Sequence, residues 1–217
     1  MGLAGSTKTL QDVIDRVTRQ FGDESGSQIT VADITNWTNS ALMEIVKKNR
    51  ILKAQSTTPS VAGQQQYTFS SLSILNIEHL QYEGKALDHK GFIEAQEYVS
   101  KYDPTMSQNG TPVVWWEWGT VLYLYPVPQV SGEDVTLYYI QTPAEVSNTS
   151  DVLTVPDTYF ETVLQYVMSQ AYEQDDDWQG SNFKAQQVDA GLNLLAEDPN
   201  SYNRGHYMSI TVLEEDM

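Results

Sequence analysis

The spacing of apolar residues changes twice along this chain, and that change constrains the fold more than any other feature. In "LQDVIDRVTRQF" and "TVADITNWTNSALMEIVKKN" the apolar residues recur at helical spacing, which predicts two amphipathic helices. After Pro59 they alternate with a period of two, as in "ILNIEHLQY" and "VTLYYIQT", which predicts β-strands. Helical spacing returns after Pro156, in "TYFETVLQYVMSQAYEQ" and "SNFKAQQVDAGLNLLAED".

This order of segments predicts an α+β protein. The N- and C-terminal helices would pack together as a four-helix bundle, and an antiparallel β-rich lobe would be inserted between them. One short helix, "FIEAQEYVSKY", interrupts the strands of the lobe. The predicted division is residues 1–56 for the first part of the helical bundle, 57–142 for the inserted lobe, 143–200 for the second part of the bundle, and 201–217 for an extended C-terminal tail.

Capping signals support the two N-terminal helices. Thr7 or Thr9 can cap the first helix, and Gly22 is placed to end it. Thr30 followed by Asp33 has the spacing of a capping box at the start of the second helix, where Ile34, Trp37, Ala41, Leu42 and Ile45 form the predicted buried stripe. The helical segments are therefore predicted from their ends as well as from their spacing.

Composition excludes several classes of protein. The chain has no cysteine, so disulfides, thiolate metal sites and a cysteine nucleophile are ruled out. No apolar run approaches the roughly 20 residues that span a bilayer, and the N-terminus lacks the apolar core of a secretion signal. The net charge is −17, and residues 143–217 hold 14 of the 29 acidic residues but 2 of the 12 basic ones. Such a chain is not expected to bind nucleic acid by neutralising phosphates, nor to bind a membrane.

The acidic stretch "AYEQDDDWQGSNFKAQQ" raises the question of a calcium site. Asp175, Asp177 and Gly180 match positions 1, 3 and 6 of a helix–loop–helix calcium loop. Position 5 is Gln179, however, and position 12 is Gln186, which cannot supply the bidentate carboxylate that the loop requires. We therefore expect an acidic turn between two helices and no bound metal.

No arrangement of residues points to catalysis. The three histidines, His79, His89 and His206, are far apart in the sequence and form no metal-binding pair. No nucleophile elbow, phosphate-binding loop or dinucleotide-binding glycine pattern is present. We expect a protein that is not an enzyme and that uses no cofactor.

The most aromatic stretch is "VVWWEWGTVLYLYPVP". On a strand, Trp116 and Trp118 would face one way, while Trp115 and Glu117 would face the other. The favoured interpretation is that one face is core and the other is covered by a neighbouring subunit, which makes Trp115, Trp116 and Trp118 possible interface residues. The alternative is a carbohydrate- or ligand-binding module that stacks its ligand on this aromatic face.

The C-terminal tail carries a short strand pattern. In "HYMSITVLEEDM", Met208, Ile210 and Val212 alternate with Ser209 and Thr211. An extended segment of this kind can add to the edge of a sheet, so Met208, Ile210 and Val212 are predicted to dock onto a partner or an adjacent subunit. The alternative is a frayed chain end with no partner.

Three of these stretches carry a resemblance to a known family. The segments "ITVADITNWTNSALMEIVKKN", "WEWGTVLYLYPVP" and "VPDTYFETVLQYVMSQAYEQDDDWQGSNFKAQQ", in this order, resemble the head-to-tail adaptor (connector) proteins of tailed double-stranded DNA bacteriophages. The resemblance spans roughly residues 10–198, with no traceable counterpart from Val61 to about Pro112. In that family an alanine–tyrosine–glutamate run followed by aspartates is common in the turn between the last two helices, which agrees with a turn that binds no metal.

The resemblance implies a structural role in the virion. Such adaptors form a ring, here expected to be dodecameric, beneath the portal, and join the portal to the tail or nozzle. Double-stranded DNA passes through the ring without specific binding. The implied location is the neck of the virion, after assembly in the host cytoplasm. A tail-completion protein or another ring protein of the virion is a further alternative.

Overall fold

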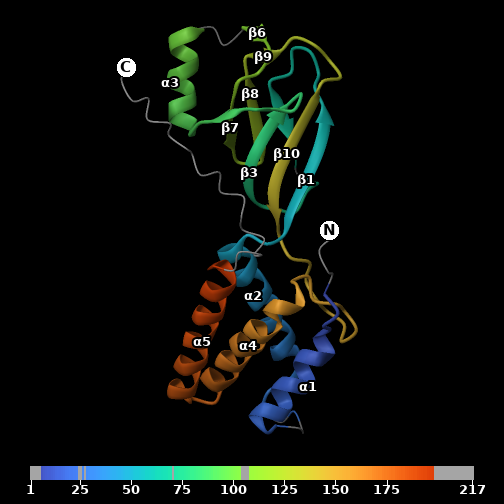
Figure 1. Cartoon of the computed structure of the whole chain (residues 1–217), viewed down its shortest axis with the longest axis vertical. Coiled ribbons are helices and arrows are strands. Elements are labelled where there is room, and N and C mark those ends of the chain that lie inside the picture. The colour runs from blue at the N-terminus through green and yellow to red at the C-terminus, as the bar shows by residue number, and fades with distance from the viewer. Residues whose placement is uncertain (1–5, 24–25, 27, 70, 104–107, 198–217) are drawn as a thin grey trace, which may run out of the picture. The chain divides into compact units, whose positions relative to one another are not determined.

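The computed structural model of the chain shows an α+β protein whose sheets are mostly antiparallel (Figure 1). The residues that it describes are 6–23, 26, 28–69, 71–103 and 108–197. The chain divides into two compact units, Met1–Ile51 with Pro143–Met217, and Leu52–Thr142. No helix of the described residues is long and apolar enough to cross a membrane.

The first unit is helical. Its helices are α1 (Leu10–Phe21), α2 (Val31–Asn49), α4 (Phe160–Gln174) and α5 (Trp178–Glu197). Helices α2 and α4 each contact the other three, and Figure 1 shows α4 between α1 and α5. The apolar side chains that these helices bury against one another include Leu10, Val13, Val17, Ile34, Leu42, Ile45, Val163, Leu164, Val167, Met168 and Leu192.

The N-terminal ends of α1 and α2 are closed by the same device. Thr9 accepts a hydrogen bond from the Asp12 backbone, and Asp12 accepts one in return from the Thr9 backbone at 2.8 Å. Thr30 and Asp33 form the second capping box, with a returning bond of 3.0 Å. The bond from the Thr9 backbone favours the ionised form of Asp12 and lowers its pKa. The Thr30 hydroxyl, which donates to Asp33 at 2.6 Å, and the Thr30 backbone lower the pKa of Asp33 in the same way. Thr9, and not Thr7, is therefore the cap of α1.

Asp157 ties the N-terminal segment to the start of α4. It begins a short 3₁₀ turn, Asp157–Tyr159, that leads into α4. Its carboxylate accepts hydrogen bonds from the Thr7 hydroxyl at 2.6 Å, the Thr7 backbone at 2.9 Å and the Ser6 hydroxyl at 3.0 Å. These bonds, led by that of the Thr7 hydroxyl, lower the pKa of Asp157 to about 2.

The low pKa of Asp157 predicts a pH-dependent contribution to stability. Because the folded-state pKa lies below the ordinary value of 3.8, the contribution is present above pH 3.8 and is lost as the pH falls towards about 2. We expect Asp157→Asn to lower the thermal midpoint at pH 7, and this difference from the native protein to shrink steadily as the pH falls from 3.8 through about 2. Thermal unfolding followed by circular dichroism across this range measures it. A difference of equal size at both ends would contradict the assignment.

The second unit contains the strands and one helix. The first sheet has the order β1 (Lys53–Pro59), β10 (Asp134–Gln141), β3 (Ile74–Tyr82), β4 (Lys85–Ala86). The second has the order β2 (Gln66–Thr68), β8 (Val121–Tyr125), β7 (Val114–Trp118), β5 (Asp88–His89). A two-stranded sheet pairs β6 (Asn109–Gly110) with β9 (Val127–Pro128), and the helix is α3 (Phe92–Tyr102).

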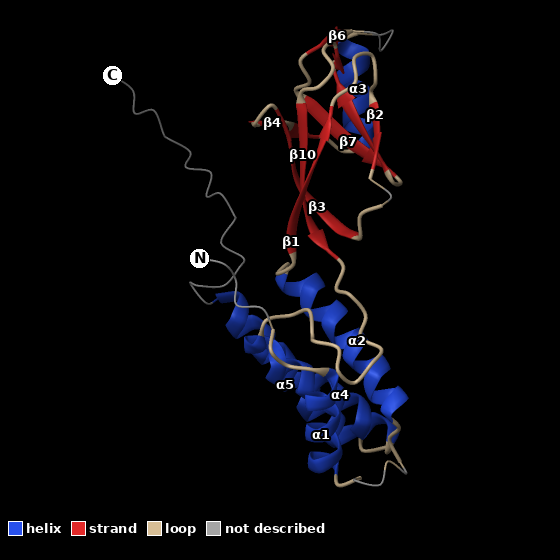
Figure 2. Ribbon diagram, turned by 90° about the vertical axis from the view of Figure 1, so that its right-hand side faces the viewer, coloured by secondary structure: helices blue, strands red, loops and turns tan. Residues whose placement is uncertain are grey.

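The two larger sheets enclose one apolar core. Alternate residues of β3, β10, β7 and β8 point into it, as the period of two requires. The core residues are Tyr67, Phe69, Leu80, Tyr82, Leu87, Trp115, Leu122, Leu124, Val135, Leu137 and Tyr139. Helix α3 contacts β7, and Figure 2 shows the strands of this unit with α3 behind them. A second, smaller cluster joins α3 to the sheet through Ala95, Val99, Trp116 and Tyr125.

Two boundaries and one buried stripe differ from those predicted from the sequence. The β unit was expected to begin at residue 57, but β1 begins at Lys53 because "KAQSTTP" is a polar edge strand that shows no apolar alternation. The last helix begins at Trp178 instead of Ser181. In α2, Trp37 is only half-buried, and the buried stripe includes the polar residues Thr38 and Asn49.

Candidate interaction surfaces

The three aspartates of the acidic stretch close the turn between α4 and α5. The Asp175 backbone N–H donates to the Ala171 carbonyl at 3.2 Å and ends α4. Asp176 has φ 58°, the left-handed conformation that turns the chain. The Asp177 carboxylate then accepts a hydrogen bond from the Gly180 backbone at 2.9 Å, as a helix-capping residue does. The turn is thus held mainly by backbone bonds and one cap.

Gly180 has a packing role in this turn. A Cβ atom added there would lie 2.5 Å from Oδ2 of Asp177 and 3.1 Å from the Tyr172 ring. Gly180 lies within the first turn of α5, whereas the glycine of a calcium loop makes a sharp bend. Among the residues that the structure describes, no three His, Cys, Asp or Glu side chains gather closely enough to hold a metal ion.

Asp177 and Asp175 have different roles in this turn. We expect Asp177→Ala to lower the free energy of unfolding by about 1 kcal/mol, since the first turn of α5 loses its capping acceptor. Asp175→Ala is the matched control, because its backbone and not its carboxylate ends α4. Thermal or denaturant unfolding compares the two variants. Millimolar calcium should leave every midpoint unchanged, and a calcium-dependent rise that Asp175→Ala abolishes would reveal a metal site instead.

The tryptophans of β7 lie on both faces of the strand, but only one of them is exposed. Trp115 packs in the core between the sheets, with its ring 4.3 Å from that of His89. Trp116 lies beneath α3 and stacks on Tyr123, with ring centroids 5.3 Å apart. Trp118 is 61% exposed. Both faces of the strand are therefore covered largely by the same chain, which leaves Trp118 as the one tryptophan of β7 that a partner or ligand can reach.

Trp118 belongs to a small exposed apolar patch. Its ring lies 4.4 Å from that of Phe92 in the first turn of α3, and the neighbouring Ile93 is 73% exposed. A hollow of about 390 Å³ in the same unit, between Phe69 and Leu122, has no tryptophan among its lining residues. A carbohydrate-binding module would use a continuous aromatic surface, whereas the exposed surface here consists of Trp118, Phe92 and Ile93.

Helices α4 and α5 border a groove of about 430 Å³. Its walls include Gln165 and Gln187, whose side-chain carbonyl oxygens are buried and have no hydrogen-bond partner among the described residues. Gly191 keeps the helices close, since a Cβ atom there would lie 2.9 Å from Oγ1 of Thr162. These two oxygens are buried polar atoms in the wall of the groove that the described residues leave without a hydrogen bond.

The outer wall of the groove is the solvent side of α5. Phe183 and Leu194 are 58% and 72% exposed, and Gln187 and Ala190 lie between them at helical spacing along one stripe. The opposite side of α5 already packs through Val188 and Leu192. A helix with two apolar faces is incompletely covered in a single chain. From the sequence, no exposed apolar face was predicted for the last helix, although the spacing from Phe183 to Leu194 could have revealed it.

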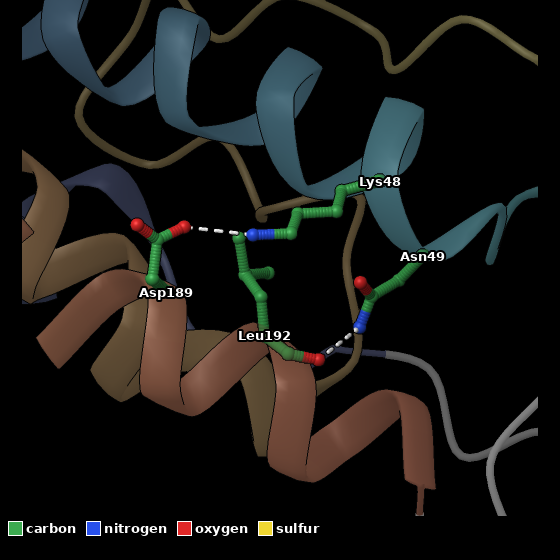
Figure 3. A network of polar contacts seen from close by, with 4 residues as sticks. All are labelled: Lys48, Asn49, Asp189 and Leu192. Carbon is green, nitrogen blue, oxygen red and sulfur yellow. Dashed lines mark hydrogen bonds and ion pairs between the residues drawn. The ribbon is translucent and has the colours of Figure 1, made fainter. Parts of the chain in front are cut away.

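The stripe is positioned by contacts between α2 and α5 (Figure 3). Asn49 is fully buried, and its Nδ2 donates to the Leu192 carbonyl and to the Tyr159 hydroxyl, both at 3.1 Å. Lys48 binds Asp189 at 2.7 Å, but both side chains are exposed to water, so this ion pair contributes less than the Asn49 bonds. Asn49 therefore sets the position of the second half of α5.

The predicted docking residues of the tail, Met208, Ile210 and Val212, lie outside the described residues. The acidic turn, the Trp118 patch and the α4–α5 groove are separate features, and none of them combines the nucleophile, base and acceptor groups of a catalytic site.

Comparison with known proteins identifies the family. A family model described as SU10 adaptor protein matches residues 8–209, which is nearly the whole chain and includes the segment from Val61 to Pro112 that the resemblance did not cover. No curated protein matches the chain. The match confirms the resemblance to phage head-to-tail adaptors, and the family is structural and not enzymatic. On the strength of a match over almost its entire length, the chain belongs to the SU10 adaptor protein family.

Proposed function

We propose that this chain is the head-to-tail adaptor in the neck of a tailed phage. Twelve copies form a ring beneath the portal, join the portal to the tail or nozzle, and surround the channel through which double-stranded DNA passes. The ring assembles in the host cytoplasm before it becomes part of the virion. The observation that carries this proposal is the family match over residues 8–209.

The surfaces of the helical unit support self-association. The stripe from Phe183 to Leu194 exposes an apolar side chain at each end, and its middle residues Gln187 and Ala190 border the α4–α5 groove. A ring buries such a surface at every contact between neighbouring copies. The Trp118 patch of the β unit offers a second exposed apolar area for a neighbouring copy or the tail protein.

The charge of the chain suits a DNA channel. Twelve copies at −17 each carry on the order of −200 charges in total. Negative walls repel the DNA phosphates, so the DNA can slide during packaging and ejection without adhering. Residues 143–217, which hold 14 acidic and 2 basic residues, are the segment that we assign to the channel wall.

A reconstruction of the virion neck tests this function. We expect one ring of this chain between the portal and the tail, with an inner surface that is net negative. A channel wall made mainly of Lys and Arg would contradict the assignment of the wall to residues 143–217. Density for the chain at any other place in the virion would refute the adaptor function.

A further inference from the structure

Strand β1 forms a long open edge of the first sheet in the β unit. In the first sheet, β1 pairs with β10 on one side, and no described strand pairs with its other side (Figure 1). Strand β1 has seven residues, whereas the other terminal strands of the two larger sheets, β4, β5 and β2, have two, two and three. A sheet edge presents unpaired backbone groups, and proteins commonly keep such edges short. Strand β1 departs from that pattern.

The pairing with β10 shows which backbone groups of β1 are used. The Gln141 N–H donates to the Leu52 carbonyl at 2.8 Å, and the Ser60 N–H donates to the Glu133 carbonyl at 2.7 Å. Between these two bonds the register of β1 against β10 is unbroken. In an antiparallel pair, alternate residues direct their backbone groups towards the partner. The even-numbered residues of β1 therefore bond to β10.

The odd-numbered residues direct their backbone groups outward. Lys53, Gln55 and Thr57 present N–H and C=O groups at the open edge, and Pro59 presents a carbonyl only. The strand has no bulge, no glycine and one charged residue, so little protects this edge from pairing. It can accept an added strand with regular hydrogen bonds up to Pro59.

The two faces of β1 specify the kind of strand that fits. Ala54, Ser56 and Thr58 are small and half-buried, and Ala54 packs at the rim of the core. The opposite face is polar and exposed. An added strand should therefore carry large apolar residues on one face, to extend cover over the rim, and small polar residues on the other.

The tail of this chain has that pattern. Met208, Ile210 and Val212 alternate with Ser209 and Thr211, and the acidic residues 214–216 follow, which complement Lys53 at one end of the edge. Between the end of α5 and Met208 lie about ten residues, which can span roughly 35 Å when extended. We propose that the open edge of β1 receives residues 208–213 of a neighbouring copy as an added strand. This pairing between copies depends on the ring that we propose above.

Cross-linking between copies tests this pairing, because the chain has no native cysteine. Full-length Thr57→Cys chains are mixed with full-length Ser209→Cys chains, assembled with purified portal and oxidised. Disulfide-linked dimers are expected on a non-reducing gel. The matched control is Thr136→Cys, because Thr136 pairs with Thr57 on the same face but one strand further from the edge, beyond disulfide reach of an added strand.

A proline substitution tests the hydrogen bonds themselves. Gln55→Pro, made in the Thr57→Cys chain, removes an N–H that points outward, so the pairing with β10 keeps its bonds while the added strand loses one. We expect the yield of cross-linked dimer to fall about tenfold with little change in the thermal midpoint.

The outcomes separate the two proposals. Rings that form without the Thr57 cross-link, or that cross-link equally through Thr136, overturn the β1 pairing and leave the adaptor function standing. A cross-link within a single chain carrying both Thr57→Cys and Ser209→Cys, or from Ser209→Cys to the portal, also overturns it. Copies that never associate on the portal overturn both proposals.

Discussion

Replacing Trp116 with alanine should lower the free energy of unfolding of the β unit by about 3–5 kcal/mol. The side chain is almost fully buried beneath α3 and stacks on its cross-strand neighbour Tyr123 at 5.3 Å. Alanine leaves a large cavity at the contact between β7 and α3, because Ala95 and Val99 cannot move far enough to fill it. Denaturant unfolding followed by the near-ultraviolet circular dichroism of the aromatic residues measures the loss.

Trp118→Ala is the matched control on the same face of the same strand. Because Trp118 is largely exposed, its loss should change the free energy of unfolding by less than about 1 kcal/mol. Trp116→Phe should fall between the two, since phenylalanine keeps most of the packing and removes an indole N–H that has no partner among the described residues. Equal losses for Trp116→Ala and Trp118→Ala would contradict the burial of Trp116 under α3.

Deletion of residues 206–217 should prevent assembly on the portal while the rest of the chain stays folded. The removed segment carries Met208, Ile210 and Val212, the residues predicted to dock onto a partner. We expect portal-bound copies to fall to background and the thermal midpoint to shift by no more than about 1 °C. Co-sedimentation with portal complexes and infectivity of complemented particles are the two measurements.

A variant that changes the side chains of the tail but keeps its length is a stricter test than the deletion. The triple variant Met208→Ser, Ile210→Ser and Val212→Ser keeps the length and the acidic end but removes the apolar face. It should fail to assemble as the deletion does. Normal assembly of both variants would show that the tail is a passive chain end, which is the alternative that the sequence left open.

The helices were predictable because their signals are local. The capping boxes at Thr30 and at Thr9, and the apolar stripes behind them, depend on residues three or four positions apart, which a sequence displays directly. The start of the β unit was not predictable in this way. Strand β1 reads as a polar loop, and it becomes a strand only because β10, far along the chain, pairs with it.

The interaction surfaces were predictable only in part. Alternation along β7 placed Trp115 and Trp116 on opposite faces, but it could not show that α3 returns to cover one of those faces. The buried Asn49 was equally invisible, because its partners Tyr159 and Leu192 come from distant segments. The role of the acidic turn followed from the missing ligand at Gln186, which is a local property of the sequence.

The pairing of β1 with β10 has a consequence for the order of folding. It brings the two ends of the inserted unit together, with Leu52 and Gln141 joined by a hydrogen bond of 2.8 Å. Once residues 52–142 have folded, they act as a short connection between α2 and the residues leading to α4. The entropy cost of closing the loop between these helices then falls by on the order of 3 kcal/mol. Substitutions that unfold the sheet should therefore lower the stability of the helical unit, although none of its own residues is changed. A short linker joining Ile51 to Pro143 should leave the helices able to fold.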